Sequence, residues 1–253
     1  MRAFMKLIFL IPILISPQVI FAQQQIEANI FTLGDSNGTF PFSWPQQLKK
    51  ALPKSRVFNI SKSGRTIGFV NNGDSSLNSL LVIDENLKKA AEFTEDRAFD
   101  FIVIELGTND AKAVFAPRQN EVSSNLDKLI KKIKHSPYPA IAKAKVIIIS
   151  PPPYGIKADT SAKYKDGGRR VEQMSESFRK VAVANGCFFV DGFRTPGLDI
   201  NTMTADGLHL DSVASRKLII PVLDIIKNNW SDRKKSDYGS TGNFVSLNKI
   251  LIK

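Results

Sequence analysis

The 253-residue sequence is poor in the residues that build disulfide frameworks and metal centres. It contains one cysteine, Cys187, which cannot form an intramolecular disulfide, and only two histidines, His135 and His209. No cluster of histidine, cysteine and acidic residues has the spacing of metal ligands. The glycine-rich turn of dinucleotide-binding proteins and the phosphate-binding lysine loop are also missing. We therefore expect neither a metal ion nor a nucleotide cofactor.

Long apolar runs and internal repeats are missing as well. The longest apolar stretch near the start, Leu7 to Ile15, contains a proline and is too short for a confident membrane span. Two basic residues, Arg2 and Lys6, precede it, and the small residue Ala22 follows. Residues 1–22 are therefore predicted to be a secretory signal peptide, which implies a secreted or periplasmic protein. An uncleaved membrane anchor is the alternative. No period of solenoid or propeller length recurs.

Basic residues outnumber acidic ones, 35 to 24, which gives a formal net charge of +11. Arg2 and Lys6 are the only charged residues before position 23, so +9 remains after removal of the signal peptide. This excess is compatible with anionic surfaces or acidic polysaccharides. A solvated, lysine-rich surface that keeps the protein soluble is the simpler interpretation. Basic and aromatic residues do not gather into a stripe that would follow a nucleic acid, so we expect no nucleic-acid partner. A homo-oligomer is compatible with the sequence.

Short apolar runs alternate with amphipathic stretches across residues 23–229. Phe101 to Ile104 is almost entirely apolar, which is typical of a strand covered on both faces. The pattern predicts strands at 30–33, 56–60, 101–104, 145–149 and 187–190, and helices at 41–52, 77–91, 121–134, 168–184 and 212–228, the last kinked near Pro221. Cys187 is expected to be a buried strand residue. Five such alternations predict one α/β domain, a three-layer α/β/α sandwich with a five-stranded parallel sheet. The tail, residues 230–253, is polar and then apolar; it can add a strand or contact a partner.

Ser36 directly follows the first predicted strand, at the edge of a parallel sheet where ligands bind. A serine needs an imidazole to accept its proton before it can attack a substrate. His135 lies at the basic end of a helix and has a structural explanation there. His209 has a carboxylate three residues earlier, Asp206, which can orient its ring. Ser36, His209 and Asp206 are therefore a candidate catalytic triad.

Four short motifs follow predicted strands in order, and the chain resembles the SGNH (GDSL) hydrolases over about residues 28–228. The motifs are Gly34-Asp35-Ser36, Gly64, Gly107-Thr108-Asn109-Asp110 and Asp206-Gly207-Leu208-His209. The stretches 106–115 and 150–153 look like the bacterial aryl-esterase/acyltransferase branch. The resemblance implies a flavodoxin-like strand order, 2-1-3-4-5. Asn37 departs from the leucine that the family often has, which bears on the shape of the acyl pocket rather than on the chemistry.

The resemblance also implies how a developing oxyanion would be stabilised. Its donors would be the backbone N–H groups of Ser36 and Gly64 and the side-chain amide of Asn109. We assign Asp35 and Asp110 to holding the loops. Three aromatic residues, Phe40, Phe42 and Trp44, are near enough in sequence to line a substrate pocket, although core packing explains them as well.

Taken together, the motifs predict a secreted serine esterase that cleaves small acyl esters, acetyl groups on carbohydrate among them, through an acyl-enzyme. An acyltransferase using the same acyl-enzyme is one alternative. A non-catalytic carbohydrate-binding protein on an inherited scaffold is another. Each residue also has a structural explanation on its own: Ser36 as a helix N-cap, and Asn109-Asp110 and Asp206-Gly207 as ordinary turns. Their coincidence at strand ends favours the esterase.

Overall fold

The computed structural model describes residues 25–94 and 97–231. The predicted signal peptide and all but the first two residues of the predicted tail lie outside these ranges. Within the described residues, no helix is both long and apolar enough to cross a membrane.

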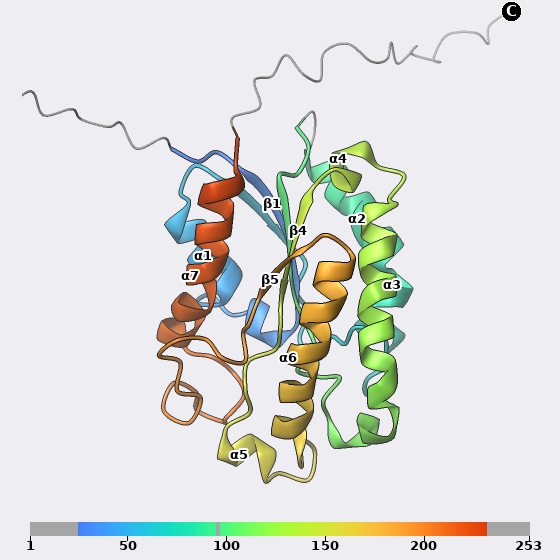
Figure 1. The fold of residues 1–253 in the computed structure, drawn as a ribbon, viewed down its shortest axis with the longest axis vertical. Coiled ribbons are helices and arrows are strands. Elements are labelled where there is room, and N and C mark those ends of the chain that lie inside the picture. Colours follow the sequence, from blue (N-terminus) through green and yellow to red (C-terminus); the bar gives the residue numbers. More distant parts are fainter. Residues whose placement is uncertain (1–24, 95–96, 232–253) are drawn as a thin grey trace, which may run out of the picture.

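A parallel sheet of five strands runs through the middle of the molecule in the order β2-β1-β3-β4-β5, which confirms the predicted fold class and strand order (Figure 1). The strands are β1 (Asn29–Gly34), β2 (Arg56–Asn59), β3 (Phe101–Glu105), β4 (Lys145–Ile149) and β5 (Phe188–Val190). Every residue of β1 and β3 is buried, which confirms the prediction that Phe101 to Ile104 is covered on both faces.

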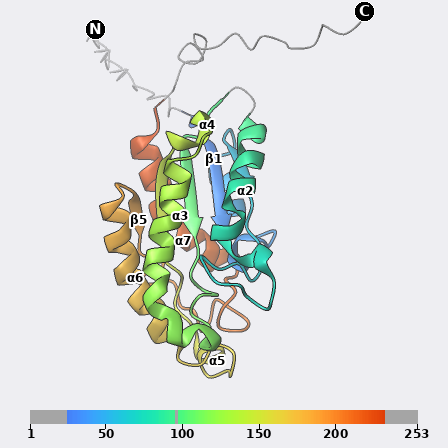
Figure 2. The same cartoon turned by 90° about the vertical axis from the view of Figure 1, so that its right-hand side faces the viewer.

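Helices cover both faces of this sheet. Two helices, α1 (Trp44–Ala51) and α7 (Ser212–Asn229), pack together on one face, and α7 remains one helix through Pro221. The helices α2 (Ser79–Thr94), α3 (Val122–Lys134) and α6 (Gly167–Ala184) lie side by side on the other face (Figure 2). The predicted helix bounds agree with these elements to within a few residues. Three layers therefore enclose two apolar cores, one on each face of the sheet.

Several short elements were not predicted. The helices α4 (Pro139–Ala142) and α5 (Ile156–Asp159) have one turn each, and three 3-10 helices, η1 (Ser36–Gly38), η2 (Ser75–Leu77) and η3 (Ala113–Glu121), lie in the connections. The prediction for Cys187 was wrong in detail: this residue precedes β5 and is half-buried. It follows the tight turn at Gly186, whose φ is +59°, and the strand begins one residue later.

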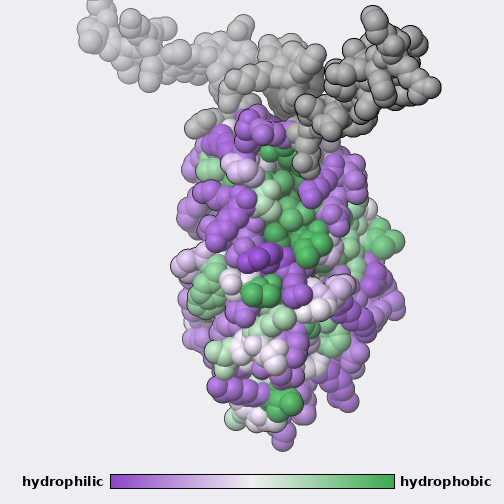
Figure 3. All heavy atoms as spheres, turned by 90° about the vertical axis from the view of Figure 1, so that its left-hand side faces the viewer, coloured by the Kyte–Doolittle hydropathy of each residue, from purple (hydrophilic) through white to green (hydrophobic). Residues whose placement is uncertain are grey.

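The face formed by α1 and α7 carries an apolar patch on an otherwise largely hydrophilic surface (Figure 3).

A cavity of about 470 Å³ lies near the amino-terminal edge of the sheet, lined by Gln25, Ile26, Ala51, Leu52, Pro53, Lys54, Lys227 and Trp230. Ser36 follows the opposite, carboxyl-terminal end of β1. This cavity is therefore separate from the edge at which the predicted site residues gather.

Candidate active site

Three of the predicted site residues follow three adjacent strands at one edge of the sheet. Ser36 comes two residues after β1, Gly64 follows β2, and Asn109 follows β3. The ends of β1 and β3 are level, since Gly34 pairs with Glu105. The carboxyl edge of a parallel sheet thus brings these three loops together.

Ser36, His209 and Asp206 form one continuous series of hydrogen bonds. His209 Nε2 lies 2.9 Å from Ser36 Oγ, and His209 Nδ1 lies 2.6 Å from Asp206 Oδ2. The structure therefore brings together two residues that are 173 positions apart. An imidazole held between a hydroxyl and a carboxylate can accept the hydroxyl proton while the carboxylate fixes its tautomer.

The loop that carries His209 is organised around Asp206. The second carboxylate oxygen, Oδ1, accepts hydrogen bonds from the backbone N–H groups of Leu208 and His209 at 3.0 and 2.9 Å. Burial raises the pKa of Asp206, but these donors and the imidazole outweigh it, so the pKa lies below the ordinary value of 3.8. Gly207 has a φ of +78°, and a Cβ there would come within 2.9 Å of the Ala158 backbone nitrogen. Asp206 is thus held ionised, and the tight turn requires glycine.

Asn109 is connected to the turn at Gly64 by a hydrogen bond to the residue that follows Gly64. The side-chain amide of Asn109 donates to the Arg65 carbonyl at 3.1 Å, which uses one of its two N–H bonds. Gly64 has a φ of +82°, a conformation that favours glycine. Among the described residues, its backbone N–H makes no hydrogen bond. Ser36 begins η1, so its N–H has no partner within that short helix. Hydrogen-bond donors from three loops are therefore available at the carboxyl edge of the sheet.

Asn37, the departure from the family pattern, links the Ser36 loop to the His209 loop. Its side chain is 2% exposed, and its Oδ1 accepts from the Leu210 backbone N–H at 2.9 Å. Its Nδ2 donates to the Leu208 carbonyl at 3.3 Å. These two contacts flank His209 on either side and hold the ring close to Ser36. A leucine could make neither of them.

The aromatic residues divide between the site and the core. Trp44 is fully buried and belongs to the core under α1. Phe40 meets the His209 ring edge-on with the ring centres 5.6 Å apart, and Phe42 stacks on Phe40 at 5.4 Å. Phe42 remains 39% exposed. The pair thus forms an apolar wall beside the imidazole, whereas Trp44 is structural.

His135 has the structural position that was predicted for it. It caps the end of α3, is exposed, and its Nδ1 lies 2.8 Å from the Lys131 carbonyl oxygen. No three histidine, cysteine or acidic side chains in the described part of the chain gather in a way that could hold a metal ion.

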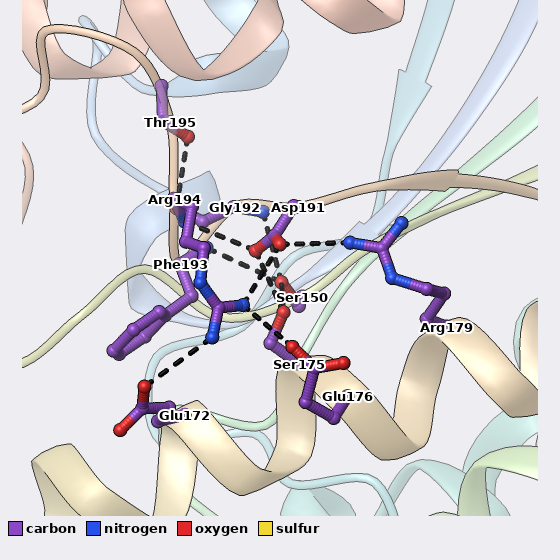
Figure 4. Close-up of polar contacts among 10 residues, drawn as sticks. All are labelled: Ser150, Glu172, Ser175, Glu176, Arg179, Asp191, Gly192, Phe193, Arg194 and Thr195. Carbon is purple, nitrogen blue, oxygen red and sulfur yellow. Dashed lines mark hydrogen bonds and ion pairs between the residues drawn. The ribbon is translucent and has the colours of Figure 1, made fainter.

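A network of polar side chains holds the loop that leaves β5 (Figure 4). Asp191 accepts from Ser175 Oγ at 2.8 Å and from Arg179 at 3.0 Å, both on α6, and from Arg194. Ser150, at the end of β4, accepts from the Gly192 N–H at 3.0 Å. No motif in the sequence predicts this network, which joins two strand ends to α6 and anchors the chain before the Asp206 loop.

Three buried carboxyl groups lie beneath these loops. Asp35 accepts from the Asn37 N–H at 2.9 Å, and Asp110 accepts from the Ile67 N–H with both oxygens at 3.0 Å. Both therefore hold loops, as predicted. Glu105, which was not predicted, ends β3; the Trp44 side chain is its polar neighbour, but within the described residues neither Glu105 oxygen makes a hydrogen bond of normal geometry. Burial raises the pKa of all three, that of Asp110 to about 7, and the Asp35 carboxylate raises the pKa of Glu105 further.

These raised pKa values predict that the protein loses stability between pH 5 and pH 7.5. The folded state keeps protons that the unfolded chain releases above the ordinary pKa values of 3.8 and 4.5, so stability falls as the pH rises until the folded-state pKa is passed. Urea unfolding at the two pH values measures the difference. Glu105→Met should reduce it and raise stability at pH 7.5 by about 1 to 3 kcal/mol, because a buried carboxyl without a hydrogen bond of normal geometry is removed.

The matched control is Asp74→Asn. Asp74 is exposed, and hydrogen bonds from Ser76 hold its pKa below 3.8, so it is ionised in both states across the window. This variant should leave the pH difference unchanged. A Glu105→Met protein with the pH difference of the unaltered protein would contradict the assignment to Glu105.

The comparisons with known proteins identify the family of the chain. Residues 31–216 match the family model described as the GDSL-like lipase/acylhydrolase family. The chain belongs to this family. Family membership makes the protein a carboxylic ester hydrolase and confirms the prediction made from the four motifs.

Solved structures share the fold of this GDSL-like hydrolase at low sequence identity. A carbohydrate acetylesterase family member from Sinorhizobium meliloti is 22% identical, with a TM-score of 0.66 over 79% of this chain and 99% of that one. The native aryl esterase of M. smegmatis is 20% identical, with a TM-score of 0.68 over 80% and 100%. The lipase/acylhydrolase of Enterococcus faecalis is 20% identical, with a TM-score of 0.62 over 82% and 100%. No curated protein matches the chain at a significant level.

Proposed function

We propose that this GDSL-like hydrolase is an exported serine esterase that cleaves small acyl esters, acetyl groups on carbohydrate among them, through an acyl-Ser36 intermediate. The observation that carries the proposal is the hydrogen-bonded series Ser36, His209 and Asp206 at the carboxyl edge of the sheet. Export rests on the predicted signal peptide of residues 1–22, with 23–229 as the catalytic domain and 230–253 as a tail. The preference for acetyl groups is supported by the likeness to carbohydrate acetylesterases.

In the first half of the reaction, Ser36 Oγ attacks the ester carbonyl carbon while its proton passes to His209 Nε2. The carbonyl oxygen becomes negative and accepts hydrogen bonds from the Ser36 and Gly64 N–H groups and from the Asn109 amide. Asp206 stabilises the imidazolium that forms. When the tetrahedral intermediate collapses, the bond to the alcohol oxygen breaks, and His209 gives its proton to that oxygen.

In the second half, water takes the place of the alcohol. His209 removes a proton from the water as its oxygen attacks the acyl carbon, and the same donors stabilise the second oxyanion. The bond to Ser36 Oγ then breaks, and the proton held by His209 returns to the serine. The products are a carboxylic acid and the original enzyme.

A panel of 4-nitrophenyl esters from acetate to palmitate, together with acetylated xylan, tests the proposed substrate class. We expect the highest kcat/KM for the shortest acyl chains and release of acetate from the polysaccharide. A preference for palmitate with no acetate release would contradict the proposal and indicate a lipase.

Asn109→Ala is expected to lower kcat by about 10²- to 10³-fold with a smaller change in KM, because the amide acts mainly on the charge that develops in the transition state. Steady-state kinetics on 4-nitrophenyl acetate measure the changes in kcat and KM. Asn185→Ala is the matched control, because Asn185 lies at the end of α6 and contacts Asp127 instead of the site. Wild-type kcat in Asn109→Ala would remove this residue from the oxyanion site.

A further inference from the structure

A second cavity lies at the carboxyl edge of the sheet, beside the loops that carry Gly64 and Asn109. Its volume is about 470 Å³, and it is lined by Val70, Asn71, Asn72, Gly73, Lys112, Ala113, Val114, Phe115, Ala162 and Lys163. Lys112 comes three residues after Asn109. None of the lining residues is acidic, whereas two are lysines. The mechanism proposed above does not use this cavity.

Asn71 joins the cavity directly to the predicted oxyanion loop. Its Nδ2 donates to the Gly64 carbonyl at 2.6 Å, and its Oδ1 accepts from Lys112 Nζ at 2.9 Å. One side chain therefore separates Gly64 from the ammonium group of Lys112. A substrate whose carbonyl oxygen met the Gly64 N–H would have this cavity within reach of its neighbouring atoms.

Lys112 is a buried cation whose charge is incompletely balanced. Its side chain is 2% exposed, and among the described residues it makes no ion pair with a carboxylate. Burial and the charge of Lys163 lower its pKa from 10.5 to about 8, while Asp35 and Asp110 oppose this shift. A buried ammonium without a paired anion is costly. An anionic ligand would supply the missing partner.

Both lysines lie close to one aromatic ring, that of Tyr164. Lys112 Nζ is 5.9 Å and Lys163 Nζ 5.3 Å from the centre of the Tyr164 ring. Burial raises the pKa of Tyr164, and the charges of Asp35 and Asp206 raise it further. Two cations and a flat ring suit a carboxylate attached to an apolar or sugar ring.

We infer that this cavity, with Lys112, Lys163 and Asn71 in its lining, binds a carboxylate carried by the ester substrate and makes the enzyme selective for anionic esters. Lys112 is the main contact because it is buried and fixed, and Lys163 contributes at the open rim. The inference deepens the proposed function and rests on it. The carboxylate can belong to the acyl group or to the alcohol, and the two sources are separable by experiment.

Two matched substrate pairs test the inference. The acyl pair is 4-nitrophenyl butyrate and mono-4-nitrophenyl succinate; the alcohol pair is 4-acetoxybenzamide and 4-acetoxybenzoate. We expect the anionic member of one pair to have the higher kcat/KM, and we expect this preference to fall as salt is added. Lys112→Met should lower the preference by about tenfold or more, and Lys163→Gln by about two- to fivefold.

Lys163→Gln keeps the test independent of folding, because Lys163 is exposed and its hydrogen bond from the Ala113 N–H uses the backbone carbonyl, which the substitution keeps. Lys49→Gln, on α1 across the sheet, removes one charge elsewhere and should change nothing. Normal turnover of neutral esters with no anionic preference, or a preference that survives both substitutions, would overturn the inference. Failure to hydrolyse any of the four esters would instead contradict the proposed function.

Discussion

Ser36→Ala is expected to lower kcat on 4-nitrophenyl acetate by about 10⁴- to 10⁶-fold, to a rate close to that of the buffer. The hydroxyl that His209 contacts at 2.9 Å is then missing, and no acyl-enzyme can form. Donors for the oxyanion and the rest of the site remain, so a small residual rate above background is expected. Initial rates at saturating ester, corrected for the uncatalysed reaction, measure the loss.

The variant should remain folded, because Ser36 is a small buried residue whose hydroxyl makes one hydrogen bond, with His209. Its thermal unfolding should match that of the unaltered protein. Ser177→Ala is the matched control: this serine lies on α6 and its Oγ donates to the Met174 carbonyl at 3.1 Å. Retained turnover in Ser36→Ala, with folding intact, would mean that another group forms the acyl-enzyme or that none is formed.

His209→Ala is expected to cost about as much as Ser36→Ala, because the serine has no other base to accept its proton. The only other histidine, His135, provides a matched control: it is exposed, caps α3, and its replacement by alanine should leave kcat unchanged. The same ester assay and an unfolding curve for each variant are sufficient. A His209→Ala enzyme with most of its activity would show that the imidazole is not the base.

The double variant tests whether the two residues act as a unit. If Ser36 and His209 operate in one step, the double variant should be no slower than either single variant, since removal of one already disables the other. Losses that multiply would instead indicate that the two side chains act independently. The interpretation of either outcome does not depend on the identity of the natural ester substrate.

The alternation of apolar and amphipathic segments was sufficient to predict the sheet and its five main helices. Their lengths are set by patterns that the sequence displays, such as the Asn185-Gly186 stop after α6 and the prolines after β4. The one-turn helices α4 and α5 and the 3-10 helix η3 were missed, because four residues or a segment interrupted by Pro117 have no helical period to detect. The start of β5 was predicted one residue too early, at Cys187, because an apolar run alone does not define where a strand begins.

The candidate site was predictable where its residues occur in motifs and not where they depend on tertiary pairing. Ser36, Asp206 and His209 carry recognisable neighbours along the chain. Asn37 contacts a loop that lies more than 170 residues later in the sequence, and no local sequence pattern predicts that contact. Glu105 was predictable as a buried carboxyl group, because an acidic residue at the end of an otherwise apolar strand is unusual. The charged cavity at Lys112 required the fold, because its three lining segments are distant in sequence.

Labelling with a fluorophosphonate, followed by mass spectrometry of the digested protein, tests the central claim most directly, because only a serine activated by a nearby base reacts rapidly. The account predicts one label per chain, on the peptide that contains Ser36, with none on Ser36→Ala and a greatly slowed reaction in His209→Ala. Rapid labelling of a different serine, or an active esterase that resists the reagent altogether, would contradict it.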